Sequence, residues 1–106
     1  MPRSSQTALI IDQSKIRIDE GLIRRGAPGF PRSLDWWKRN TPLWLDATED
    51  EQGRIILEPN GLQANGVTRE VTPALRRRHL QYARSWAAGL TFLDLSDAIG
   101  FAGGAA

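Results

Sequence analysis

Apolar and aromatic positions recur at helical spacing in one stretch of the chain, residues 72–88. The positions that share one face are Leu75, His79, Tyr82, Ala83 and Trp86. At 100° per residue they fall within an arc of about 100°, the width typical of a helix that packs against a core. The opposite face carries Arg77, Gln81, Arg84 and Ser85. This pattern predicts an amphipathic helix with a core face centred near His79 and a solvated, basic outer face.

Both ends of this segment carry residues that favour helix boundaries. Thr72 can cap the first turn, and Pro73 stands at the first helical position, where its missing N–H is not needed. Gly89 follows the last helical position, where a left-handed residue is expected. The sequence therefore predicts a capped helix from Thr72 to Ala88.

Two segments show patterns typical of β-hairpins. In the first, an apolar run at residues 8–11 and an alternating segment at 15–19 flank turn-forming residues 12–14. One longer bent strand is the alternative there. In the second, residues 43–47 and 54–58 flank an acidic turn in which Gly53 can take a positive φ.

Short helices are predicted on either side of these elements. Ser33 can cap a helix at residues 34–39, on which Leu34, Trp36 and Trp37 share the apolar face. Near the C-terminal end, residues 92–99 can form a final short helix, with a strand over 90–95 as the competing interpretation.

Together these elements predict an α+β fold. A small antiparallel sheet of two hairpins packs against the helix at about 73–88, and one or two short helices complete the core. The length of 106 residues fits one domain at 7–99. Residues 1–6 are expected to form a flexible N-terminal tail. Residues 100–106, rich in Gly and Ala, are expected to fray unless Phe101 docks.

Composition narrows the function classes. The chain has no cysteine, which excludes disulfide scaffolds, thiolate zinc sites and cysteine nucleophiles. It also lacks a phosphate-binding P-loop, a dinucleotide fingerprint and a nucleophile elbow. The longest uninterrupted apolar run is too short to span a membrane, and residues 1–6 do not resemble a signal peptide. We therefore expect a soluble, cytoplasmic protein without a cofactor.

Charge is segregated along the chain although the net charge is only +2. Residues 46–60 carry five acidic side chains and one basic one, whereas residues 61–88 carry five arginines and Glu70. The acidic block can either dock on the arginine-rich helix or face a partner. Arg76 falls on the apolar side of the predicted helix, and a buried arginine needs a carboxylate. We therefore expect Arg76 to pair with an acid from residues 46–58.

Arginines supply the main candidate binding surface. Arg77 and Arg84 project from the same helix face and, with Arg78, can meet phosphates or carboxylates. Arg24 and Arg25 lie in a Gly/Pro-rich loop with Phe30 and Arg32, a composition that a nucleic-acid-binding arm can have. Trp36 is a further candidate, because tryptophan is enriched at the centres of protein interfaces.

The remaining chemistry is sparse. His79 is the only histidine, and its place in the apolar stripe favours a core role over catalysis or metal binding. The acidic cluster Asp46, Glu49, Asp50 and Glu51 lacks the alternating spacing of a calcium loop, so no metal site is predicted.

The sequence favours a small non-enzymatic binding module. It is expected to occupy a partner protein assembly or its nucleic acid through the arginine-rich helix face and a tryptophan-containing surface. The alternative is a small hydrolase or a nuclease-like or toxin-like enzyme using His79, Tyr82 and a carboxylate. The identity of the partner and the oligomeric state are left open.

Overall fold

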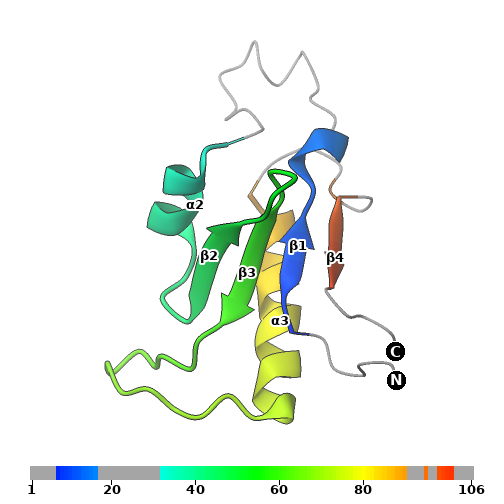
Figure 1. Cartoon of the computed structure of the whole chain (residues 1–106). Helices are drawn as coiled ribbons and strands as arrows, with labels where there is room; N and C mark the ends of the chain where they lie inside the picture. Colours follow the sequence, from blue (N-terminus) through cyan, green and yellow to red (C-terminus); the bar gives the residue numbers. More distant parts are fainter. Residues whose placement is uncertain (1–6, 17–31, 91–94, 96–97, 102–106) are drawn as a thin grey trace.

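The computed structural model describes residues 7–16, 32–90, 95 and 98–101. Its elements in chain order are β1 (Leu9–Ile11), the 3-10 helix η1 (Gln13–Lys15), α2 (Leu34–Asn40), β2 (Leu45–Glu49), β3 (Ile55–Pro59), α3 (Pro73–Ala88) and β4 (Ile99–Phe101). The four strands form one antiparallel sheet in the order β2-β3-β1-β4. α3 lies across one face of the sheet and α2 lies beside β2 (Figure 1). The predicted α+β fold is confirmed.

The core lies between the sheet and α3. The antiparallel register sets Leu9 opposite Leu57 and Ile11 opposite Ile55, and all four side chains are fully buried. Burying one such aliphatic side chain contributes about 1.5–3 kcal/mol. Because side chains alternate along a strand, the residues between them point to the opposite face, which no described helix covers.

The second predicted hairpin is present, with its strands shifted by one or two residues toward the C-terminus. Asp50 organises the turn: its Oδ1 accepts hydrogen bonds from the N–H groups of Gln52 and Arg54, at 2.9 and 2.8 Å. The Nε of Arg54 donates to Oδ2 of Asp50 at 2.7 Å. Gly53 has a φ of 80°, as its place in the turn predicted.

The neighbours of β1 differ from the first predicted hairpin. β1 pairs with β3 on one edge and with β4 on the other, so the segment at 15–19 is not its partner. Lys15 belongs to η1, which Asp12 caps by accepting hydrogen bonds from the N–H and the hydroxyl of Ser14 at 3.1 and 2.6 Å. Residues 17–19 lie outside the described residues.

α3 has the predicted bounds and N-cap. The Oγ1 of Thr72 accepts a hydrogen bond from the N–H of Leu75 at 3.1 Å. The prediction for its other end is wrong in one respect, because Gly89 has a φ of −88° and is not left-handed. Its N–H instead bonds to the carbonyls of Ser85 and Trp86, at 3.2 and 3.1 Å, so the last turn is tightened.

The core face of α3 is rotated from the predicted one. Leu80, Ala83 and Ala87 are fully buried, whereas Tyr82 is 54% exposed. His79, expected at the centre, is only half-buried. The two small alanines let the helix backbone approach the sheet closely, and this moves the large aromatic side chains to the edge of the interface. The placement of Tyr82 in the core is therefore wrong.

α2 is confirmed as a short helix capped by Ser33, whose side chain accepts a hydrogen bond from the N–H of Trp36. Trp37 is 1% exposed and belongs to the core. Gln13, a buried polar residue, fastens η1 to α2. Its Oε1 accepts from the backbone N–H of Arg32 at 2.7 Å and from Nε1 of Trp37 at 3.3 Å, and its Nε2 donates to the carbonyl of Arg32 at 3.2 Å.

The C-terminal segment ends in a strand. A helix was expected at 92–99, but Ile99 is the first residue of β4. Residues 91–94 and 96–97 lie outside the described residues. Phe101 pairs opposite Leu9 and packs against the core, so the docking that would hold residue 101 does occur. Among the described residues, no helix is long and apolar enough to cross a membrane.

Candidate binding surface

α3 carries four arginines and no acidic residue. Arg77, Arg78 and Arg84, the predicted binding residues on this helix, are all exposed. We call these three side chains the arginine face. Their exposure follows from the helical repeat. Leu80, Ala83 and Ala87 occupy the side against the sheet, Arg78 lies opposite them, and Arg77 and Arg84 lie along one flank.

The predicted ion pair of Arg76 with the acidic block is wrong. Arg76 is half-buried, and its Nη1 donates a hydrogen bond to the backbone carbonyl of Thr7 at 3.3 Å. Arg76 does not meet the acidic side chains of β2 and β3 because side chains alternate between the two faces of a sheet. Asp46 and Glu58 face each other across β2 and β3, and both are exposed between neighbours that are buried against α3. Their carboxylates therefore point to the other side of the sheet.

The charge of α3 is not neutralised within the described part of the chain. There the ion pairs join Lys15 to Asp12 at 4.0 Å and Arg54 to Asp50 at 2.7 Å. None involves an arginine of α3. Asp46 and Glu58 thus lie on the face of the sheet away from α3, and α3 presents a positive surface.

Arg84 is held by an aromatic ring. Its guanidinium carbon lies 5.7 Å from the centroid of the Phe101 ring, on β4. A cation over a ring face is attracted by the quadrupole of the ring, typically by about 0.5–1 kcal/mol at exposed sites. The contact orients the guanidinium and leaves its charge intact.

An aromatic cluster lies along the flank of α3 opposite Arg77 and Arg84, and Arg78 is the arginine next to it. It consists of Trp44, His79 and Tyr82. The His79 and Tyr82 ring centroids lie 4.8 and 6.3 Å from that of Trp44, and 6.3 Å from each other. Tyr82 is one of three large hydrophobic side chains exposed in the described chain, and Leu43, next to Trp44, is another at 71% exposed. Tryptophan, tyrosine and arginine are the residue types enriched at the energetic centres of interfaces.

The surroundings of His79 favour its neutral form. Burial lowers its pKa, and the positive charges of Arg78 and Arg69 lower it further. Within the described residues no carboxylate is among the groups that shift this pKa. Of the three groups that the alternative enzyme would use, His79 and Tyr82 lie close together, and no carboxylate of the described residues is among the groups that act on the histidine.

Trp36, another predicted binding residue, does not belong to the aromatic cluster. Trp36 is half-buried, packs edge-on against Trp37 at 5.1 Å between ring centroids, and carries the Arg32 guanidinium at 4.1 Å from its centroid. Arg24 and Arg25 lie outside the described residues. Trp36 therefore remains a separate candidate.

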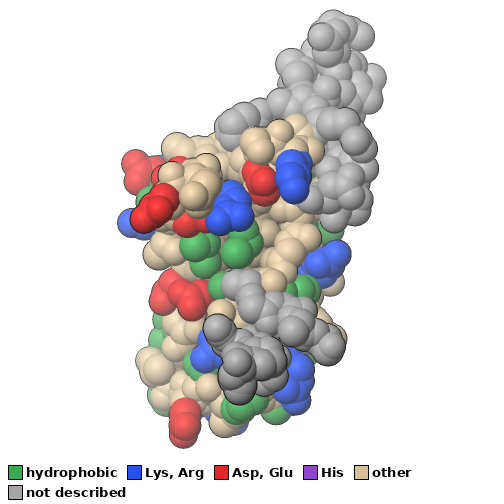
Figure 2. Space-filling view, turned by 45° about the vertical axis from the view of Figure 1, so that its right-hand side comes forward, with side chains coloured by type: hydrophobic (Ala, Val, Ile, Leu, Met, Phe, Trp, Pro, Cys, Tyr) green, Lys and Arg blue, Asp and Glu red, His purple; other side chains and the backbone are tan. Residues whose placement is uncertain are grey.

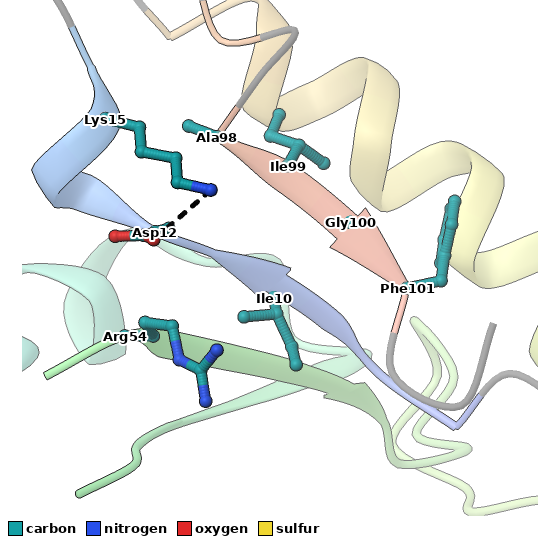
Figure 3. A pocket seen from close by; sticks show the side chains of 8 residues that line it. All are labelled: Ile10, Asp12, Lys15, Arg54, Ala98, Ile99, Gly100 and Phe101. Atoms are coloured by element: carbon teal, nitrogen blue, oxygen red, sulfur yellow. Dashed lines mark ion pairs between the residues drawn. The ribbon is translucent and has the colours of Figure 1, made fainter. Parts of the chain in front are cut away.

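The open face of the sheet offers a second, weaker candidate. In Figure 2, a small apolar patch lies between acidic and basic side chains on the visible face. A hollow of about 230 Å³ lies between β1 and β4, lined by residues that include Ile10, Asp12, Lys15, Arg54 and Gly100. Figure 3 shows Ile99 and Phe101 on the side of α3, with Gly100 between them adding no side chain.

The basic side chains around this hollow already form ion pairs. Lys15 pairs with Asp12, as Figure 3 shows, and Arg54 pairs with Asp50. Among the described residues, no group of three or more His, Asp or Glu side chains could hold a metal ion. The hollow therefore has less to offer an ionic ligand than the surface of α3.

Two members of the candidate surface were missed from the sequence. The sequence pattern predicts Trp44 within a strand and Phe101 within a C-terminal tail. In the structure Trp44 lies just before β2, and Phe101 is the last residue of β4. The contact of Trp44 with His79 and that of Phe101 with Arg84 join separate segments of the chain, so no local sequence pattern predicts them. Comparison with known proteins found no matching family model, no matching curated protein and no matching solved structure.

Proposed function

We propose that this protein is a small binding module without a catalytic role, which occupies a partner through the arginine face of α3 and the adjoining aromatic cluster. The observation that carries the proposal is the set of α3 arginines, which form no ion pair with any described carboxylate. Exposed guanidinium groups whose charge is not neutralised internally can bind carboxylates or phosphates of a partner.

The aromatic cluster supports the same proposal. Trp44 and Tyr82 supply apolar contact area beside Arg78, and both have few rotatable bonds to immobilise on binding. The neutral state favoured for His79 suits a packed contact surface. An enzyme using His79 and Tyr82 would need a carboxylate that the described residues do not bring to the histidine.

Affinity capture with matched variants tests this proposal. The tagged full chain and its Arg77→Ala/Arg84→Ala variant are used to retain partners from source-cell lysate, and retained protein and nucleic acid are identified. Lys38→Ala/Arg39→Ala is the control, because it removes the same charge from exposed positions on α2. We expect one partner to disappear with the α3 variant and to be kept with the α2 variant. Retention that is equal on all three proteins contradicts the proposal.

A further inference from the structure

We infer that the partner is a single-stranded nucleic acid, whose phosphates meet the arginines of α3 and whose bases stack on the aromatic cluster. This inference rests on the proposed function and names its ligand class. It follows from the placement of arginines along one edge of α3 and of rings along the other, with Arg78 on the exposed surface between them.

Two arginines of α3 have guanidinium groups that neutral neighbours already orient, which favours the binding of an anion. Arg76 is oriented by the carbonyl of Thr7 and Arg84 by the ring of Phe101. Both partners are neutral, so each guanidinium is positioned without losing its charge. An arginine that is already oriented loses less side-chain entropy when it binds a phosphate.

The spacing along the helix suits a chain of phosphates. Arg77 and Arg84 are seven residues apart, which is roughly 10 Å along the axis at 1.5 Å per residue. They lie close in angle around the helix, at two full turns. Two such arginines can contact different phosphates of one strand, and nothing acidic on α3 repels that strand.

The rings on the other edge can receive bases. Tyr82 is exposed, and its ring is braced by Trp44, whose plane is inclined 79° to it. Arg78 precedes Tyr82 by four residues and therefore lies beside it on the helix surface. Proteins that bind single strands without sequence preference combine these two elements, a positive track and aromatic stacking platforms.

Unpaired bases are required for this arrangement. In a duplex the base faces are stacked on one another, so only the arginines would find contacts and affinity would be lower. An acidic protein surface would also satisfy the arginines, but it does not supply a regular series of phosphates together with flat bases that stack on an exposed ring. Single-stranded DNA and RNA share the chemistry, and the test compares them.

Fluorescence anisotropy with labelled 20-nucleotide probes tests the inference. The full chain is titrated against single-stranded DNA, single-stranded RNA and the corresponding DNA duplex at several salt concentrations. We expect at least one single strand to bind more tightly than the duplex, with affinity that falls as salt rises. For Arg77→Ala/Arg84→Ala, the slope of log affinity against log salt should become shallower by about 1.4, because each phosphate that an arginine neutralises on a single strand contributes about 0.7 to the slope.

Two comparisons separate stacking from charge. Tyr82→Leu should weaken single-strand binding by roughly five- to 100-fold with little change in the salt slope. Tyr82→Phe, which keeps the ring, should restore binding to near the original level. Lys38→Ala/Arg39→Ala should change affinity much less than the α3 variant. Circular dichroism checks that each variant is folded, which the exposure of Arg77, Arg84 and Tyr82 favours.

Several results would overturn the inference. These are no binding of either single strand at low salt, equal reductions in affinity for the α2 and α3 variants, or an unchanged affinity for Tyr82→Leu. If the probes fail while a protein partner from the lysate disappears only with Arg77→Ala/Arg84→Ala, the ligand class is wrong and the proposed function stands. If neither probe nor lysate partner depends on Arg77 and Arg84, both are wrong.

Discussion

The imidazole of His79 packs against the indole of Trp44, with ring centroids 4.8 Å apart and planes inclined by 51°. This contact places the histidine at the edge of the core, where burial lowers its pKa and the charges of Arg78 and Arg69 lower it further. Its Nδ1 is buried and has no hydrogen-bond partner among the described residues. The histidine is therefore held neutral at neutral pH.

The pKa of His79 predicts a loss of stability in mild acid. An unfolded histidine titrates near pH 6.5, and the folded group titrates below that value. Between the two pKa values the unfolded chain binds more protons, so the free energy of unfolding falls as the pH is lowered from about 7 through the folded pKa. His79→Phe should remove this part of the pH dependence.

The measurement is direct because the chain has one histidine. An NMR titration gives its folded pKa, and urea denaturation at pH 7.5 and pH 5 gives the two free energies for the parent chain and for His79→Phe. A folded pKa of 6.5 or higher would contradict the account. So would an identical pH dependence of the two proteins.

Gln13 should be a strong stability determinant despite its polar side chain. Replacing it with leucine removes its hydrogen bonds to the backbone of Arg32 and to the indole of Trp37. Losing the partner of a buried polar group costs about 1–3 kcal/mol. Gln81→Leu is the matched control, because Gln81 is exposed on α3 and should change stability by no more than about 0.5 kcal/mol. Chemical denaturation that finds equal effects would show that the Gln13 contacts do not hold η1 to α2.

Gly61 and Gly66 should respond differently to the same substitution. Both have a positive φ, of 83° and 87°. A Cβ at Gly61 would overlap the backbone carbonyl oxygen of Arg69, whereas at Gly66 it meets nothing within 4 Å. Gly66→Ala should therefore cost only the left-handed strain, about 1–2 kcal/mol.

Gly61→Ala should cost clearly more than that or prevent folding, since a backbone atom cannot move aside as a flexible side chain can. Thermal and urea unfolding of the two variants provide the comparison. Equal losses of stability would mean that the backbone of the loop between β3 and α3 can shift at little cost, which contradicts its close packing around Gly61.

Local sequence patterns were sufficient for the elements whose signals are local. The caps at Ser33 and Thr72, and the turn glycine Gly53, mark α2, α3 and the β2–β3 hairpin, and each signal concerns residues a few positions apart. The position of the core face of α3 was harder. Large aromatic side chains were assigned to the core, but the close approach to the sheet selects small residues such as Ala83 and Ala87.

Long-range contacts account for most of the remaining differences. The pairing of β1 with β4 joins residues about 90 positions apart. The three residues of β4 show no sequence pattern from which their pairing with β1 could be predicted. The hydrogen bond from Arg76 to Thr7 has the same character. The candidate surface was therefore predictable in its arginines, which follow the helix repeat, and not in Trp44 or Phe101.

The most direct test of the central claim is a nitrogen–proton NMR titration of the labelled full chain with the single-stranded probe. We predict that the perturbed backbone amides lie along α3, around Arg77 to Arg84, and that the indole N–H of Trp44 shifts with them. The indole N–H of Trp37, bonded to Gln13 in the core, serves as an internal reference and should stay in place. Perturbations confined to the open face of the sheet around Ile10 and Arg54, or none at all, would contradict the claim that α3 is the binding surface.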